Sequence, residues 1–566
     1  MKRTYKFGWI ILIALIPLLP LSGWNYSIDV SDVGFNLNQY RFCFTDMDST
    51  YLPLFLTNIL GGCLLRLFEV LHIPAYIGME AAWAAVCFYL CFLSYRLYVR
   101  YRRDTLILPA LAFAMVFAKC NFHFFIYNTA VAFMALTGLY FLIRAVNDKK
   151  SWMLFFAAAF FMLASFCKIS SLLQFAVFAV LFYDLYRKKD VAYFVRQVLW
   201  CVAGVLCSFA AGLVLMYKTC GISTYFQMVA DMFLYAGNSN DGHTIGNMVV
   251  INFKGTVRGM LLLAVIYVIY LAAAKIKRLA PVIGYGMIAV AVLLLAGAVL
   301  GADQIAGLSI LYRVLGDYLN AVAVIKAMMY VCAVLILRDK ETSEEFKILT
   351  LASCALAVLM PIGSNVGITH LCNEAFYILP YILICAGEKI RKSENNRKIV
   401  VIIFTIWCVI LTASQSLYMT KAYVRDKEQK QQFTLDELRG IRYDTAIVLP
   451  MEEVVNFIKS YGGESDKMVA CGAIPILHYL TGRAPYITGC GGWIETDYVT
   501  AEEIKQQLDA SAESDSGGKT MPLVVFNKTA LDKPSEKTDV VLSFVKKYSY
   551  QQVFENEEYK VYAKKN

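Results

Sequence analysis

The chain has 566 residues, of which 59% are hydrophobic and 17% are charged, and its mean hydropathy is +0.55. Soluble domains have about half apolar and about a quarter charged residues, so this composition excludes an ordinary soluble enzyme, a disordered protein and a small disulfide-rich module. The net charge of +10 is uneven, because residues 1–420 carry 34 Lys+Arg against 21 Asp+Glu and residues 421–566 carry 19 against 22. The excess positive charge lies in the apolar part, which is typical of a membrane protein and not of a nucleic-acid-binding one.

A transmembrane helix needs about 20 mostly apolar residues. The first apolar run, residues 8–24, follows a basic N-terminus, lacks a clear cleavage site and is followed by more runs, so we interpret it as a retained helix and not a signal peptide. About thirteen spans are predicted in all. The others lie near residues 74–98, 105–119, 124–146, 151–167, 169–186, 197–217, 257–274, 281–300, 318–337, 346–361, 375–387 and 398–417.

Clusters of Lys and Arg recur after every second predicted span. The positive-inside rule assigns such clusters to the cytoplasm. The sequence therefore predicts a multi-pass protein of the plasma membrane with a cytoplasmic N-terminus and, after an odd number of spans, an extracytoplasmic C-terminal domain. The clusters are Lys2-Arg3, Arg100 with Arg102 and Arg103, Lys149-Lys150, Arg187-Lys188-Lys189, Lys275 with Lys277 and Arg278, Arg338 with Lys340 and Lys347, and the Lys and Arg residues of 389–398.

Residues 51–71 are also long enough to span, but a crossing there would place Arg100 outside and break the alternation of basic clusters. The segment also contains Arg66 and Glu69. We therefore predict an interfacial or re-entrant helix along the outer leaflet. The first outer loop then covers residues 25–73, and long ordered loops often carry function.

The composition changes after residue 420. Residues 421–444 are predicted to be a linker, in which residues 421–437 form either a charged linker or an amphipathic helix. Residues 445–566 alternate between helical and strand patterns, which indicates a small α/β domain. The predicted helices are 451–461, 475–481, 501–510 and 535–547, and the predicted strands are 468–471, 522–526 and 559–562.

Two carboxylates, Asp29 and Asp32, follow the first predicted span at the membrane surface. On one helical turn they would face the same side, where they could bind a cation or accept a proton from an incoming hydroxyl. The alternative is a structural role, with Ser31 or Asp32 as the N-cap of a helix that continues to Arg41. The spacing alone leaves both alternatives open.

Three short stretches then resemble elements of the GT-C superfamily of polyprenyl-phosphate-sugar glycosyltransferases, which includes protein O-mannosyltransferases, aminoarabinose transferases and oligosaccharyltransferases. They are Ser31-Asp32-Val-Gly-Phe-Asn-Leu, Tyr51-Leu-Pro-Leu-Phe-Leu-Thr-Asn-Ile-Leu and Ala164-Ser-Phe-Cys-Lys168. The resemblance covers nearly the whole chain in topology, although its motifs are short. It implies a GT-C-like membrane fold and transfer of a sugar from a polyprenyl-phosphate donor to a glycan, lipid or protein acceptor outside the cytoplasm.

Within this resemblance, Asp32 matches the catalytic acidic residue of the family best. The next residue is Val33 where the family has a second acid, so Asp29 is the candidate for a second carboxylate. Which aspartate is the base, and whether the reaction needs a divalent metal, both stay open.

The remaining candidate site residues lie in predicted outer loops or at outer helix ends. Lys168, Arg258 and Arg313 are candidates for binding the donor phosphate, with snorkelling or neutralisation by nearby aspartates as the alternative for the two arginines. Asp48, His370 and Asn373 are candidate acceptor or donor contacts, against ordinary loop capping. Residues 217–252 are interpreted as an outer loop whose aromatic residues form a membrane belt.

Two other functions compete with the glycosyltransferase. A polysaccharide polymerase or ligase would use the same lipid-linked substrate. A lipid or solute transporter is expected to have two related halves with broken helices and polar residues at the membrane midplane. Charges in this sequence gather at the predicted outer ends of the helices and no relation between halves is visible, which favours the glycosyltransferase.

Overall fold

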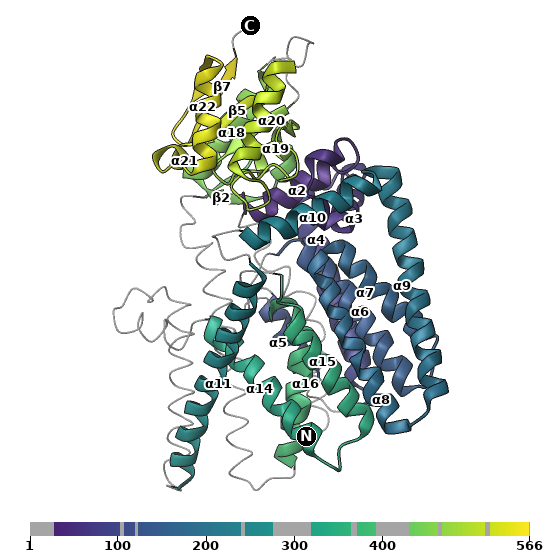
Figure 1. Cartoon of the computed structure of the whole chain (residues 1–566). Coiled ribbons are helices and arrows are strands. Elements are labelled where there is room, and N and C mark those ends of the chain that lie inside the picture. The colour runs from purple at the N-terminus through teal and green to yellow at the C-terminus, as the bar shows by residue number, and fades with distance from the viewer. Residues whose placement is uncertain are drawn as a thin grey trace.

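The computed structural model describes residues 28–101, 107–118, 123–238, 244–275, 318–363, 371–391, 430–461, 467–514 and 521–564. Within these residues the protein is an elongated bundle of helices with a small α/β domain at one end (Figure 1). The predicted spans 8–24, 281–300 and 398–417 lie outside the described residues.

The bundle is built from the apolar runs of the sequence. Its helices are α4 Ala75–Tyr98, α5 Ile107–Ala118, α6 Tyr127–Asn147, α7 Met153–Cys167, η3 Ile169–Ala179, α8 Val180–Lys188, α9 Val191–Thr219, α11 Ile245–Lys275, α14 Tyr318–Arg338, α15 Glu344–Leu359 and α16 Leu371–Arg391. In the described part of the chain, six stretches are long and apolar enough to cross a membrane, namely Leu52–Val70, Ala75–Tyr98, Tyr127–Asn147, Ile169–Lys188, Val191–Thr219 and Gly246–Val265. This pattern is that of a multi-pass membrane protein, as predicted.

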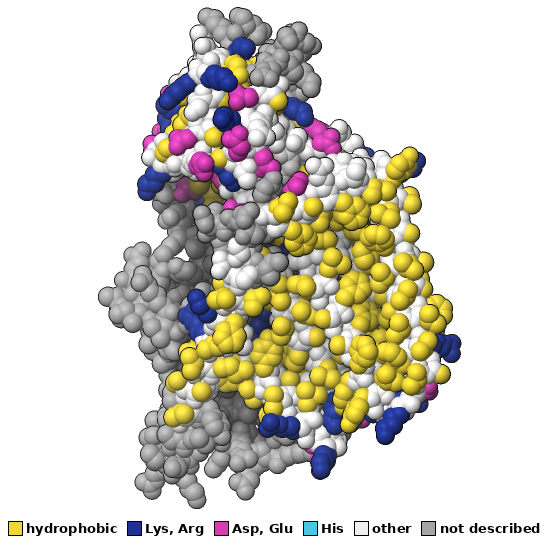
Figure 2. Space-filling view, viewed as in Figure 1, with side chains coloured by type: hydrophobic (Ala, Val, Ile, Leu, Met, Phe, Trp, Pro, Cys, Tyr) yellow, Lys and Arg dark blue, Asp and Glu magenta, His cyan; other side chains and the backbone are white. Residues whose placement is uncertain are grey.

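The outer surface of the bundle is apolar, as its interior is. Trp83, Leu139 and Phe161 are at most 2% exposed in the core, whereas Phe92 and Leu206 are more than half exposed. Figure 2 shows hydrophobic side chains covering one broad face of the bundle, while Asp and Glu gather on the C-terminal domain. A helix that is apolar on all sides suits a lipid environment, so this face is the one expected to contact acyl chains.

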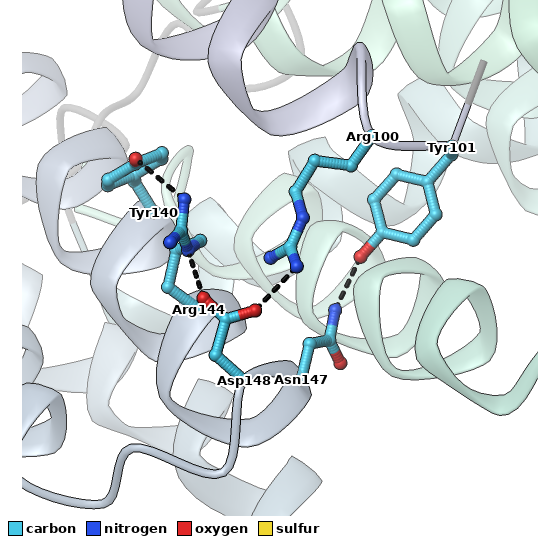
Figure 3. A network of polar contacts seen from close by, with 6 residues as sticks. All are labelled: Arg100, Tyr101, Tyr140, Arg144, Asn147 and Asp148. Atoms are coloured by element: carbon cyan, nitrogen blue, oxygen red, sulfur yellow. Dashed lines mark hydrogen bonds and ion pairs between the residues drawn. The ribbon is translucent and has the colours of Figure 1, made fainter.

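A polar network joins the ends of α4 and α6 (Figure 3). Asp148, directly after α6, accepts hydrogen bonds from Arg100 and Arg144, and Asn147 donates to the hydroxyl of Tyr101. Because these contacts bring the C-terminal ends of α4 and α6 to the same side, α5 must return the chain between them. This is the alternation that the basic clusters at residues 100–103 and 149–150 predict. The assignment of that side to the cytoplasm stays a prediction.

Three helices lie at the end of the bundle next to the C-terminal domain (Figure 1). They are α2 Asp32–Phe42, α3 Phe55–Val70 and α10 Ile222–Asn238, and the 3-10 turns η1 Met47–Ser49 and η2 Leu52–Leu54 connect α2 to α3. The α3 helix contacts α2, α4 and α7. Its interfacial placement stays a prediction, since residues 52–70 also meet the length and composition of a span. The α10 helix occupies a stretch that was predicted to be a loop.

The C-terminal domain contains a mixed five-stranded sheet in the order β4-β3-β5-β7-β6. Its strands are β3 Lys467–Cys471, β4 Ala484–Pro485, β5 Leu523–Asn527, β6 Tyr550–Glu555 and β7 Tyr559–Lys564, and its helices are α18 Thr445–Ser460, α19 Ile476–Thr481, α20 Ala501–Ser514, α21 Lys528–Asp532 and α22 Glu536–Lys547. β3 runs parallel to β4 and β5, and β7 runs antiparallel to β5 and β6. The three predicted strands are the three central ones.

The structure describes the segment before this domain from residue 430 onward. β1 Lys430–Gln432 pairs with β2 Arg442–Asp444, with the turn η7 Asp436–Leu438 between them. Leu438 and Ile441 are fully buried, and η7 contacts α4. This part of the predicted linker therefore holds the domain against the bundle.

Candidate functional site

The α2 helix is the platform on which the membrane part and the C-terminal domain meet. Gly34 on α2 lies so close to Ile476 of α19 that an added Cβ would stand 2.6 Å from the Ile476 Cβ atom. Asn38 donates a hydrogen bond to the Gly491 carbonyl (2.7 Å), and Arg41 donates to the Tyr479 carbonyl (2.6 Å). These contacts fix the domain directly on α2.

Asp29 has a structural role at the start of α2. Its Oδ1 atom accepts hydrogen bonds from the backbone N–H of Ser31 (2.9 Å), the Ser31 hydroxyl (3.0 Å) and the backbone N–H of Val33 (3.4 Å). It thereby satisfies an otherwise unbonded donor of the first helical turn. The N-cap residue Ser31 forms no capping hydrogen bond with its side chain.

The carboxylate of Asp32, unlike that of Asp29, does not bond the start of α2. Within the described ranges, no hydrogen bond or ion pair to its half-buried carboxylate is found. Burial, and then the neighbouring Asp29 carboxylate, raise the pKa of Asp32 from 3.8 to about 6, although a helix N-terminus by itself favours the ionised form. A carboxylate with a pKa near neutrality and no bonded partner is suited to accept a proton.

Two tyrosines from distant segments are the electrostatic neighbours of Asp32. Tyr127 is the first residue of α6, and Tyr498 follows a glycine-rich loop of the C-terminal domain. The ammonium nitrogen of Lys168 lies 5.2 Å from the centre of the Tyr127 ring. Tyr127 thus neighbours both the carboxylate and the cation.

Lys168 lies in the turn between α7 and η3, where burial lowers its pKa to about 8. In the described part of the chain, no carboxylate forms an ion pair with it. Gly363, which has φ +101°, approaches the same place, because a Cβ built on it would stand 3.7 Å from the Lys168 Cε atom and would clash with Ser170. A cation at this end of the bundle, without a carboxylate partner among the described residues, is available to an anionic ligand.

An aromatic cluster closes the site on the side of the C-terminal domain. The Tyr51 and Tyr498 rings stack with centroids 3.9 Å apart and an interplanar angle of 15°. Phe35 of α2 packs against Tyr498 (6.0 Å) and Trp493 (6.1 Å). The sequence prediction missed Tyr51, Tyr498 and Trp493. The signal that could have found them is the run Gly489 to Gly492, in which Gly491 has φ +60° and an added Cβ would clash with Phe35.

Several predicted site residues are not joined to Asp32 in the described part of the chain. Asp48 is exposed in η1, with Cys220 at the end of α9 as a neighbour. Arg258 was predicted at a helix start, but α11 begins at Ile245, so Arg258 lies more than three turns into the helix on an exposed face. Arg313 and His370 lie outside the described residues, and Asn373 lies in the first turn of α16.

Among the described residues, no three His, Cys, Asp or Glu side chains converge in a group that could hold a metal ion. Asp29 and Asp32 supply two carboxylates, and Asp29 already uses Oδ1 for the start of α2. One or two carboxylates can hold Mg²⁺ together with substrate phosphates and water, so the need for a divalent metal stays open and no reaction step is assigned to one.

The site therefore combines an unbonded carboxylate, a neighbouring tyrosine and a buried cation at the end of an apolar bundle, under a domain that packs on the same helix. This arrangement can accept a proton from one ligand and hold the negative charge of another. Comparison of the chain with protein-family models and with curated proteins finds no match.

Proposed function

We propose that the protein is an integral membrane glycosyltransferase with a GT-C-like fold, which transfers a sugar from a polyprenyl-phosphate donor to an acceptor hydroxyl outside the cytoplasm. The observation that carries this proposal is the Asp32 carboxylate, which has no bonded partner among the described residues and a pKa of about 6. In the proposed reaction Asp32 takes the proton of the acceptor hydroxyl, whose oxygen forms a bond to the anomeric carbon of the sugar. The bond from that carbon to the phosphate oxygen breaks, and the polyprenyl phosphate leaves with the electron pair.

Lys168 supports this reaction as the partner of the departing phosphate. A preorganised cation in a site that excludes water stabilises negative charge that develops in the transition state. Phosphate needs no protonation to leave, so one carboxylate is enough for the chemistry. Tyr127, which neighbours both Asp32 and Lys168, is a positioning residue between the two groups.

The surroundings of the site suit a lipid-linked donor. The bundle presents a broad apolar face below the site (Figure 2), along which a polyprenyl chain could lie while its phosphate reaches the end of the bundle. Exposed apolar side chains such as Phe182, Leu199 and Leu206 contribute to this surface. A soluble acceptor would approach from the side of the C-terminal domain.

One observation favours a transporter as a second candidate. Lys326 of α14 and Glu374 of α16 form an ion pair of 3.1 Å inside the bundle, with side chains 2% and 1% exposed. Lys326 also donates to the Ala357 carbonyl (3.1 Å). Ionisable pairs inside membrane bundles often line ion pathways. The two candidates separate experimentally, because Lys326→Met would abolish proton-coupled uptake in a transporter, whereas a transferase would lose fold stability and not a specific flux.

The test of the proposed function is mass spectrometry of cell-surface glycans, lipids and glycoproteins. Cells without the gene should lack one sugar modification, and the wild-type gene should restore it. Asp32→Asn should fail to restore it at equal membrane abundance, whereas Asp532→Asn, on the exposed α21 helix, should restore it fully. A complete set of modifications in the deletion strain, or full restoration by Asp32→Asn, would contradict the proposal.

A further inference from the structure

A cavity of about 270 Å³ lies between α10 and the C-terminal domain, next to the candidate site. The stacked rings of Tyr51 and Tyr498 form part of its wall. Because Tyr498 is also an electrostatic neighbour of Asp32, the same side chain borders both the cavity and the carboxylate. The cavity is smaller than the roughly 300–1,000 Å³ of pockets for drug-sized ligands, and its size suits one monosaccharide unit.

The lining joins apolar surfaces to groups that bond hydroxyls. The methionines Met228 and Met232 of α10 lie beside the tyrosine pair, and Gln227 and Asp231 come from the same helix. A pyranose ring has a C–H face that packs on aromatic and thioether groups, and its hydroxyls both donate to carboxylates and bond amides. The mixture therefore matches a neutral carbohydrate better than a purely apolar ligand.

The polar groups of the opposite wall are partly committed to the fold. Gln507 uses Oε1 to accept from the backbone N–H (2.9 Å) and the hydroxyl (3.2 Å) of Thr488, which leaves its amide N–H groups to serve as donors. Glu503 accepts from the backbone N–H and hydroxyl of Thr500 (2.8 and 2.9 Å). Thr488, bonded to Gln507, therefore lies on the side of the cavity formed by the C-terminal domain. The carboxylate of Asp231 lies on the side formed by α10.

The charges of the lining exclude the donor phosphate. Among the described residues, Asp231 and Glu503 line the cavity and no Lys or Arg does, so a phosphate or carboxylate ligand would meet repulsion there. The buried cation of the site, Lys168, faces Tyr127 instead. The donor phosphate and the cavity ligand would then approach the reaction from different sides.

We propose that this cavity is the acceptor subsite and that it binds one neutral, polyhydroxylated sugar unit at the end of the acceptor. The inference rests on the proposed function, since it assigns the acceptor class of the same site as a glycan. The bound sugar stacks on Tyr498 and bonds Asp231 and Gln227, with one hydroxyl directed toward Asp32. Lipid and protein acceptors without a sugar are thereby disfavoured.

The test is binding of the full-length protein, in detergent micelles, to a glycan array that carries neutral and acidic terminal sugars. The wild type should bind a subset with neutral terminal sugars saturably. Asp231→Ala should weaken that binding about tenfold or more, the loss expected for one hydrogen bond to a charged group, and Met232→Trp should abolish it by filling the cavity. Asp532→Ala, on exposed α21, is the matched control and should bind as the wild type does.

The outcomes separate this inference from the proposed function. Asp32→Asn should bind the array normally, because the base is not needed for binding. Absence of saturable binding by the wild type, a preference for acidic sugars, or unchanged binding by both Asp231→Ala and Met232→Trp would overturn the acceptor subsite. Normal sugar transfer by Asp32→Asn, with array binding lost in the two cavity variants, would instead contradict the proposed catalytic base and keep the subsite.

Discussion

Tyr51, between α2 and α3, and Tyr498 in the C-terminal domain stack face to face, with ring centroids 3.9 Å apart. The pair joins the loop after α2 to a domain that follows the entire helical bundle in the sequence. Stacked aromatic pairs contribute about 0.5–1.5 kcal/mol beyond the area that they bury. The contact places an aromatic side chain of the C-terminal domain beside Asp32, so the domain is part of the proposed site.

Asp29, which precedes α2, and Asp32, its first residue, are expected to respond differently to substitution. Asp29→Ala removes the acceptor of three hydrogen bonds at the helix start and should lower the stability of the protein by about 1 kcal/mol, the usual cost of losing a helix cap. Asp29→Asn should retain most of the wild-type stability, because the amide oxygen can accept the same hydrogen bonds. Asp32→Asn should not destabilise, since its carboxylate has no bonded partner in the described part of the chain. Thermal unfolding in detergent measures all three, and equal losses at both positions would contradict the division of roles.

The pKa of Asp32 sets a pH dependence of both activity and stability. The transfer rate should rise with pH, with a midpoint near pH 6, because Asp32 must be ionised to act as the base. The pKa of Asp32 in the folded protein lies above the unfolded value of 3.8, so the folded state binds the proton more tightly. The stability that this proton contributes is present at low pH and is lost as pH rises from about 4 to 6. Asp32→Asn should remove this stability change. A wild-type rate profile that is flat between pH 5 and 7 would contradict the assignment.

Lys168 should make the affinity of the protein for a phosphate ligand fall at a lower pH than is usual for a lysine site. Its lowered pKa of about 8 means that the ammonium is lost above that pH, so binding of undecaprenyl phosphate should weaken between pH 7 and 9.5. Lys168→Arg keeps its charge in this range and should bind equally at both pH values. Lys168→Met should bind weakly throughout. Native mass spectrometry with undecaprenyl phosphate measures this, and pH-independent binding by the wild type would remove Lys168 from the phosphate site.

The close approach of α2 and α19 should be sensitive to a single methyl group. Gly34→Ala places a Cβ 2.6 Å from the Ile476 Cβ atom and 2.8 Å from its backbone nitrogen, so the C-terminal domain must shift and should be cleaved faster by protease. Gly246→Ala in α11 is the matched control, because nothing lies within 4 Å of the added atom. The control should be as stable as the wild type or slightly more stable, since Ala favours a helix.

Much of the helical framework was predictable because it follows from the length of apolar runs. The helices α4, α6 and α9 begin and end within six residues of the predicted spans. The α10 helix was missed because its residues 222–238 mix polar and apolar side chains and its length falls short of a span. The strand β6 was missed because only part of its TyrGlnGlnValPheGlu sequence is apolar, and its pairing with β7 depends on the sheet.

Site residues could be predicted only where their position next to a predicted helix marks them in the sequence. Asp32 could be singled out because it follows the first apolar run, and Lys168 because it ends a helix. The run Gly489 to Gly492 indicates a turn close to Trp493 and Tyr498, but it could not place them at the site, since they reach Phe35 and Asp32 through the packing of a separate domain on α2. The separate roles of the two aspartates also required the hydrogen bonds of Asp29, which sequence spacing does not reveal.

The most direct measurement is the release of undecaprenyl phosphate by the purified full-length protein, followed by liquid chromatography and mass spectrometry. The protein is incubated with undecaprenyl-phosphate-linked hexoses and pentoses and with neutral oligosaccharide acceptors. The wild type should release undecaprenyl phosphate and lengthen one acceptor by one sugar. Asp32→Asn should do neither, while its thermal stability is not lowered and its binding of undecaprenyl phosphate stays unchanged. Equal product formation by wild type and Asp32→Asn would contradict the account.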